Sequence, residues 1–201
     1  PATTLALDFW EDNWKELIIM QLTKRQWLMF SFFIVNFAYI LLAAALTGDF
    51  GVIFANLSIL IFLAALYLER GYASRYYVLL AAVWLIVEFI MSWVFNGVIP
   101  TSIEGMLYLG TEIALYVAVG FFGYTYYHNL FKQNKYWILI IVLAAPTLAI
   151  ELLYASSALA QFTLNIPPLT MIQIILSIIY SMTLPAVMII YTIIRKKEIT
   201  Y

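Results

Sequence analysis

The ten Lys and Arg residues of this chain lie in four short segments, which alternate with three segments that carry no basic residue. The basic segments precede the first long apolar run, separate the second from the third and the fourth from the fifth, and follow the last. The residues are Lys15, Lys24, Arg25, Arg70, Arg75, Lys132, Lys135, Arg195, Lys196 and Lys197. Loops on the cytoplasmic side of a membrane are enriched in Lys and Arg. The alternation therefore predicts six membrane-spanning helices, with the N and C termini both in the cytoplasm.

The composition of the chain agrees with this prediction. Hydrophobic residues make up 65% of the 201 residues and charged residues 10%, whereas an ordinary soluble domain has about 25% charged residues. A helix needs about 20 apolar residues to cross the hydrocarbon core of a bilayer. Because the loops are short, we predict an all-α integral membrane protein in which residues 23–201 form one six-helix transmembrane domain. The predicted spans are 27–47, 51–69, 76–97, 104–127, 136–158 and 169–194.

The first 22 residues have a different pattern. Between Leu7 and Ile18, apolar residues recur at 10, 14, 17 and 18, and charged residues occupy 11, 12, 15 and 16. This spacing places the two kinds of residue on different faces of one helix. We predict that residues 1–22 form a short amphipathic helix at the cytoplasmic membrane interface. Such a helix is an anchor in the simplest interpretation, and the alternative is that residues 5–22 bind a protein partner.

Three glutamates, Glu88, Glu112 and Glu151, interrupt the apolar runs of the third, fourth and fifth predicted spans. A charged side chain at the bilayer centre costs about 3 kcal/mol on insertion scales, so intramembrane ionisable residues are candidates for function. With a rise of about 1.5 Å per residue, all three lie about 20 to 24 Å from the cytoplasmic ends of their helices. The predicted spans contain no Lys, Arg or His to neutralise them. We therefore expect the glutamates either to be protonated or to meet a cation from outside the chain.

Each of these glutamates has an aromatic residue three or four positions away in the same span. Residues with this spacing share a helix face. Carboxylates and aromatic rings together favour organic cations, which interact with both the charge and the ring quadrupole. The sequence thus predicts a ligand site made of Glu88, Glu112, Glu151, Trp84, Tyr108, Tyr116 and Tyr154. Other polar residues in the first and sixth spans are expected mainly to form hydrogen bonds between helices: Asn36, Tyr39, Gln173, Ser177 and Ser181.

Several kinds of site are disfavoured by the residue types present. The absence of cysteine excludes disulfides, thiolate nucleophiles and cysteine-bound metals. His128 is the single histidine and lies at the cytoplasmic end of the fourth span, whereas haem and zinc sites commonly use more than one histidine. The scattered basic residues do not form a nucleic-acid surface. We expect no metal, no cofactor and no nucleic acid. The expected partners are the lipid bilayer and a small-molecule or lipid-like ligand.

Three classes of function are compatible with this pattern. The first is a membrane transporter or receptor that binds a small organic cation or a vitamin-like solute at the glutamate and aromatic site. The order of Trp84 and Glu88 in one span and Glu112 in the next resembles small membrane terpene cyclases of the fungal meroterpenoid type, in which acidic residues are implicated in cyclisation. That resemblance implies an intramembrane enzyme for a lipid or isoprenoid substrate, with Glu88, Glu112 or Glu151 as its acid. The third class is a membrane sensor or assembly subunit, and we assign the chain to no family.

Overall fold

The computed structural model describes residues 23–51, 53, 56–68, 73–97, 100–132, 135–160 and 167–200. These residues contain helices and short connections and no strand, which confirms the all-helical prediction. The amphipathic helix predicted at residues 1–22 lies outside the described residues. The helices are α2 (Lys24–Thr47), α4 (Leu57–Tyr67), α5 (Ala73–Asn96), α6 (Ile103–Tyr127), a 3-10 turn η1 (Leu130–Lys132), α7 (Tyr136–Ala160) and α8 (Pro168–Thr200).

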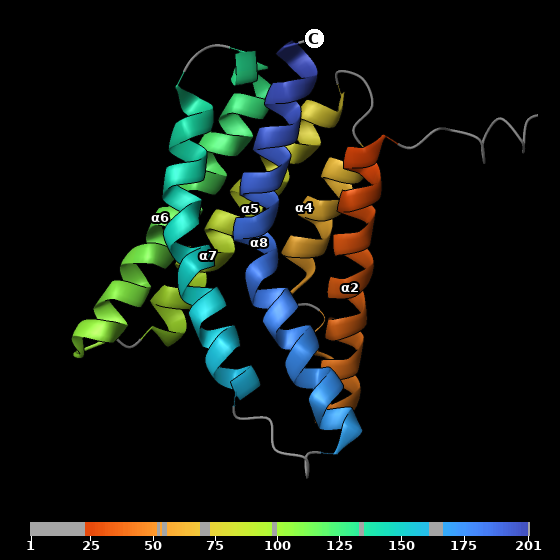
Figure 1. Cartoon of the computed structure of the whole chain (residues 1–201), viewed down its shortest axis with the longest axis vertical. Helices are drawn as coiled ribbons and strands as arrows, with labels where there is room; N and C mark the ends of the chain where they lie inside the picture. The colour runs from red at the N-terminus through yellow and green to blue at the C-terminus, as the bar shows by residue number, and fades with distance from the viewer. Residues whose placement is uncertain are drawn as a thin grey trace, which may run out of the picture.

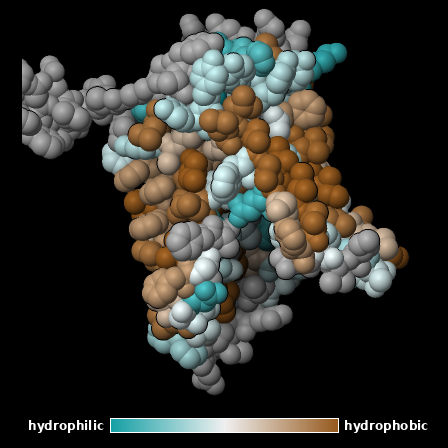
Figure 2. All heavy atoms as spheres, turned by 180° about the vertical axis from the view of Figure 1, so that it is seen from behind, coloured by the Kyte–Doolittle hydropathy of each residue, from teal (hydrophilic) through white to brown (hydrophobic). Residues whose placement is uncertain are grey.

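Five of these helices, α2, α5, α6, α7 and α8, are long and apolar enough to cross a membrane. On the face seen in Figure 2, apolar atoms cover most of the middle of the bundle, and hydrophilic atoms gather at its upper end and in a hollow between apolar regions. By length and composition, the chain is a multi-pass membrane protein. The helix α4 is shorter, with 11 residues, or about 17 Å at the usual rise. It lies within the predicted span 51–69, which is described only in part.

Local sequence explains where the long helices begin and end. Thr23 caps α2, because its hydroxyl accepts a hydrogen bond from the Gln26 amide at 3.2 Å and its own amide donates to the Gln26 side chain at 3.0 Å. Gly48 ends α2 with a φ of 67°, a left-handed conformation that glycine adopts without a steric penalty. Ser102 caps α6 by accepting from the Gly105 amide at 3.1 Å.

The six helices form a closed ring in chain order. Each helix packs against the next one along the chain, and α8 packs against α2 to complete the ring (Figure 1). The helices α2, α5 and α7 run in one direction and α4, α6 and α8 run in the other (Figure 1). The described basic residues therefore all lie at the end of the bundle where α2 begins and α8 ends. We call this the basic end of the bundle and the other the far end.

The interior of the ring is filled with aromatic side chains toward the basic end. Phe122 is the centre of this cluster, with its ring centroid 5.4 Å from that of Tyr191, 5.7 Å from that of Phe131 and 5.9 Å from that of Phe62. All of these side chains are buried, and aromatic contacts of this kind add to the energy of burial. We define the aromatic core as Phe62, Phe122, Tyr126, Phe131 and Tyr191. The aromatic core fills the interior of the ring at the basic end.

Close packing between α5 and α6 depends on a glycine. A Cβ atom added at Gly123 would lie 2.9 Å from the Cβ of Ala82, whereas carbon atoms pack at about 3.5 to 4.0 Å. A Cβ added at Gly120 would lie 3.4 Å from the Ile86 side chain. At Gly110, on the same helix, an added Cβ would meet no atom within 4 Å. Among these three glycines, only Gly123 lies so close to α5 that no space is left for a side chain.

We predict that Gly123→Ala lowers the free energy of unfolding by about 1 to 2 kcal/mol, because the added methyl pushes α5 and α6 apart. Gly110→Ala is the matched control and should leave stability unchanged or raise it by up to about 1 kcal/mol through helix propensity. Reversible unfolding in mixed micelles, followed by circular dichroism, measures both. Equal effects of the two substitutions would show that α5 and α6 are not in close contact at Gly123.

Candidate functional site

A cavity of about 380 Å³ lies inside the ring, between the aromatic core and the far end. Its walls come from the start of α4, the second half of α5, the first half of α6, the second half of α7 and the middle of α8. Every helix except α2 therefore contributes to it. We call it the glutamate cavity, because Glu88, Glu112 and Glu151 all line it.

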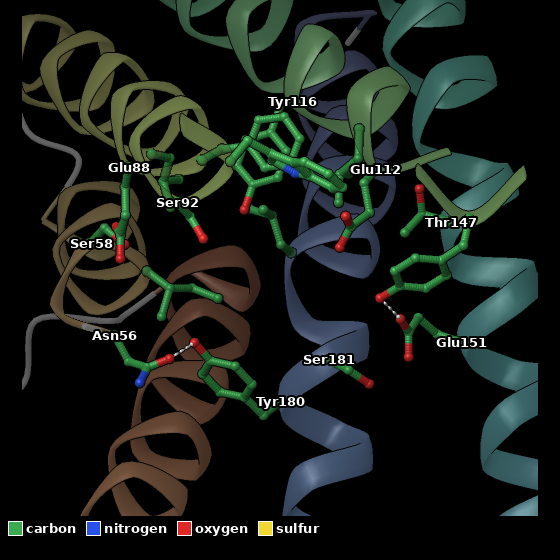
Figure 3. A pocket seen from close by; sticks show the side chains of 17 residues that line it. Asn56, Ser58, Glu88, Ser92, Glu112, Tyr116, Thr147, Glu151, Tyr180 and Ser181 are labelled. Atoms are coloured by element: carbon green, nitrogen blue, oxygen red, sulfur yellow. Dashed lines mark hydrogen bonds between the residues drawn. The ribbon is translucent and has the colours of Figure 1, made fainter. Parts of the chain in front are cut away.

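The three glutamates stand on two sides of this cavity (Figure 3). Glu88 projects from α5 beside Ser58, while Glu112 and Glu151 lie across the cavity on α6 and α7 (Figure 3). None of the described residues that line the cavity is Lys, Arg or His. The glutamate cavity therefore combines three carboxyl groups with no positive charge from the described chain.

Hydrogen bonds between helices hold several of the lining residues. The Tyr108 hydroxyl on α6 donates to Oε1 of Glu151 on α7 at 3.4 Å. On the same two helices, the Thr147 hydroxyl donates to the carbonyl of Thr111 at 2.8 Å. Across the cavity, the Tyr180 hydroxyl donates to Oδ1 of Asn56 and so joins α8 to the start of α4 (Figure 3).

Glu88 differs from the other two glutamates in its surroundings. Its Oε2 atom is buried and has no hydrogen-bond partner among the described residues. An unsatisfied buried polar atom costs about 1 to 3 kcal/mol, more if it is charged. Such a cost at a cavity wall is typical of a group that is kept for binding or chemistry and not for stability.

Aromatic rings form much of the remaining wall. Phe89 on α5 stacks on Tyr116 of α6, with ring centroids 4.1 Å apart and an angle of 15° between the planes. On the opposite side, Tyr180 packs against Tyr39 of α2 at 4.8 Å. Trp93 and Tyr108 also line the cavity. Carboxyl groups and aromatic rings are thus close neighbours in one enclosed space.

Five of the seven residues predicted for the site line the glutamate cavity, namely Glu88, Glu112, Glu151, Tyr108 and Tyr116. The estimate that the three glutamates share one level agrees with their place in a single cavity. Two aromatic residues lie elsewhere. Tyr154 is 57% exposed, lines a second cavity and makes an edge contact with Tyr108, with centroids 6.3 Å apart. Trp84 is 60% exposed and is not part of either cavity wall.

The outward position of Trp84 has a geometric reason. Four residues turn a helix by about 400°, so Trp84 sits about 40° around the helix from Glu88. In α5 that rotation moves it from the interior stripe, which includes the buried Leu85, to the outer surface. Only a narrow stripe of each helix faces the ring interior. Two residues spaced three or four apart therefore do not always both face the cavity.

Other polar predictions have different outcomes. Asn36 is buried and donates to the Thr183 hydroxyl at 2.9 Å, a hydrogen bond between helices of the kind expected for this residue. Ser181 lines both cavities and Ser177 lines the second, while Gln173 lines neither. Sequence reasoning did not assign several other cavity residues to the site, among them Asn56, Phe89, Trp93, Thr147 and Tyr180. The spacing of Leu85, Phe89 and Trp93 at four-residue intervals is the one sequence signal that marks part of this set.

The carboxyl groups surround the cavity and do not converge on one point. Among the described residues, no group of three or more His, Asp or Glu is arranged to hold a metal ion. A spread of this kind suits a ligand several atoms across.

Comparisons of the chain with protein-family models, with curated proteins and with solved structures found no match, so function has to be inferred from the cavity itself.

We predict that Glu88→Leu raises the free energy of unfolding by about 1 to 2 kcal/mol, because it replaces a buried oxygen that has no described partner by an apolar group of similar size. Glu104→Leu, at an exposed carboxylate in the first turn of α6, is the control and should give no such gain. The same mixed-micelle unfolding measures both variants. A loss of stability in Glu88→Leu would contradict the interpretation and show that this carboxyl group contributes to folding.

Proposed function

We propose that this chain is a six-span membrane protein with both termini in the cytoplasm, and that it binds a small organic cation in the glutamate cavity as a transporter or a receptor. One observation carries the proposal. Three carboxyl groups and several aromatic rings line one cavity, and its described lining residues include no basic side chain.

The six-span count is supported by the direction of the helices. Because α2 and α5 run the same way, the chain has to return across the bundle between them, and α4 runs in that opposite direction (Figure 1). The described basic residues all lie at one end of the bundle, as expected when every second loop is cytoplasmic. Five crossings would instead place the two termini on opposite sides of a membrane.

We predict that cysteines at two positions of the far end react with an impermeant thiol reagent applied outside cells, and that cysteines at two positions of the basic end do not. The far-end variants are Phe50→Cys, at a side chain that is 69% exposed, and Thr101→Cys, which is also exposed. The basic-end variants are His128→Cys and Lys135→Cys, at exposed positions beside α6 and α7. The chain contains no cysteine of its own, so the unmodified protein is the blank. Reversed labelling would overturn the proposed orientation.

Size and chemistry both support an organic cation as the ligand. Small-molecule cavities usually measure about 300 to 1,000 Å³, and the glutamate cavity is near the lower end of that range, at about 380 Å³. A quaternary or protonated nitrogen gains from the carboxylates and from the faces of aromatic rings. It does not require ligands gathered at one point, as a metal ion does. A vitamin-like cation of this size fits the same description.

The position of the aromatic core bears on how a ligand reaches the cavity. The core is buried at the basic end, and the glutamate cavity lies on its other side. In the proposed orientation, a ligand therefore arrives from outside the cell. A receptor needs only this open side, whereas a transporter also needs the aromatic core to separate during each cycle.

We predict that organic cations bind and that neutral compounds of the same shape do not. Isothermal titration calorimetry in lipid nanodiscs would use choline, benzyltrimethylammonium and thiamine, with 3,3-dimethylbutan-1-ol as the neutral analogue of choline. Glu112→Gln should weaken cation binding by about tenfold or more, which equals about 1.4 kcal/mol, because the amide keeps the size and loses the charge. Asp49→Asn, at an exposed loop position outside the cavity, should leave affinity unchanged.

Two outcomes would contradict the proposed ligand class. Failure of all three cations to bind would remove the case for a cation site. Equal affinity for choline and its neutral analogue would show that charge does not matter, and would favour the isoprenoid enzyme as the alternative, since its substrate is uncharged before reaction.

A further inference from the structure

A second cavity, of about 600 Å³, lies next to the glutamate cavity and nearer the far end. Its walls come from the start of α6, the end of α7 and the first half of α8, and include Glu104 and Tyr154. We call it the outer cavity. Both of these side chains are exposed, so the outer cavity opens to the surroundings of the protein.

The two cavities share three wall residues, Tyr108, Glu151 and Ser181. Two of the three are joined, because the Tyr108 hydroxyl donates to Glu151 Oε1. This hydrogen bond connects α6 to α7 at the boundary between the cavities. The Tyr108–Glu151 pair therefore forms part of the partition that separates them.

The hydrogen bond in this partition is a long one. The distance of 3.4 Å between the two oxygens is long for an O–H···O bond, which is usually about 2.7 to 2.8 Å. On the side of the outer cavity, Tyr108 is in edge contact with Tyr154, an exposed residue that offers little resistance to movement. By contrast, the aromatic core on the opposite side of the glutamate cavity is buried and packed ring against ring. The weaker of the two barriers thus faces the far end.

The distribution of charged side chains also favours entry of a cation from the far end. Glu104 stands in the outer cavity, Glu151 at the partition, and Glu112 and Glu88 in the glutamate cavity. The described Lys and Arg residues all lie at the basic end, so none of them offsets these carboxylates. A series of like charges along a low-dielectric passage raises the local concentration of an oppositely charged ligand.

We infer that the outer cavity is the access vestibule for an organic cation, and that the hydrogen bond between Tyr108 and Glu151 is the gate between this vestibule and the glutamate cavity. The inference rests on the proposed function. Glu104 attracts the cation, and the rings of Tyr108 and Tyr154 contact it in the vestibule. The Tyr108–Glu151 bond breaks to let the cation pass and forms again behind it.

A gate differs from a ligand contact in its kinetics. Removing a gate bond lowers the barrier for both directions of passage, so the association and dissociation rate constants rise together and the equilibrium affinity stays the same. Removing a ligand contact changes the affinity, mostly through dissociation. Rates of binding therefore distinguish the two roles for Tyr108.

The test uses the whole 201-residue chain in nanodiscs and benzyltrimethylammonium as the probe. The readout is stopped-flow tryptophan fluorescence, to which Trp93 in the wall of the glutamate cavity contributes. Tyr108→Phe keeps the ring and removes the hydroxyl. Association and dissociation should each become about fivefold faster, the factor expected for loss of one hydrogen bond. Unchanged rates, or a weaker Kd with an unchanged association rate, would overturn the gate.

A second variant tests the vestibule without altering the partition. Glu104→Gln should slow association by about threefold at low ionic strength, and the difference should vanish at high salt because exposed charges are screened. Dissociation should not change. Asp49→Asn removes one carboxylate from the same end of the bundle but from outside both cavities, and should leave association unchanged. A Glu104→Gln protein with normal association at low salt would overturn the vestibule.

The outcomes separate this inference from the proposed function. If benzyltrimethylammonium does not bind the unmodified protein, the proposed cation site itself fails. A different result is that benzyltrimethylammonium binds with a Kd that depends on Glu112, while Tyr108→Phe and Glu104→Gln both keep the association and dissociation rates of the unmodified protein. In that case only the proposed access route is wrong.

Discussion

The contact between α2 and α8 closes the helix ring, and the site depends on that closure. Asn36 is fully buried and donates to both the Thr183 hydroxyl, at 2.9 Å, and the carbonyl of Phe32, at 2.7 Å. Thr183 in turn donates to the Ile179 carbonyl at 2.8 Å. Polar contacts of this kind are worth about 1 kcal/mol between membrane helices, and they also specify which faces meet. One turn before Thr183 on α8, Tyr180 is thereby held against both Tyr39 and Asn56.

The ring contains two unlike halves, and the difference explains how one bundle can be both stable and functional. Toward the basic end, the buried rings around Phe122 fill the interior and form part of the buried apolar core. Toward the far end, the same helices diverge around carboxyl, hydroxyl and aromatic groups that leave a cavity of about 380 Å³. Polar groups beside a cavity usually lower stability, and proteins offset such costs elsewhere in the fold. In this bundle, the burial of the aromatic core offsets the cost in stability of the polar groups beside the cavity.

The helix α8 belongs to both halves. Pro185 lies inside it and removes the backbone donor that the carbonyl of Ser181 would otherwise meet one turn later. Ser181 lines both the glutamate cavity and the outer cavity. Beyond the proline, Val187 and Met188 are fully buried in the core. A single helix thus changes from a polar wall to an apolar packing surface within about two turns, and the proline stands at the change.

The sequence by itself determined the all-helical fold and the placing of Glu88, Glu112 and Glu151 in three successive apolar segments, because hydropathy acts along one chain. The helix ends differ from the predicted spans, most clearly at 51–69, where the described helix α4 covers Leu57–Tyr67. Only the tertiary structure decided which side chains face the cavity. Trp84 points outward, whereas Phe89 and Tyr180 point inward, and Tyr108 meets Glu151 from another helix. In a helix that is apolar all round, the pattern does not mark the face that turns to the ring interior, because lipid and protein interior both accept the same residues. The rotation of each helix about its axis is set by contacts such as Gly123 with Ala82 and Asn36 with Thr183, which exist only after the helices pack together.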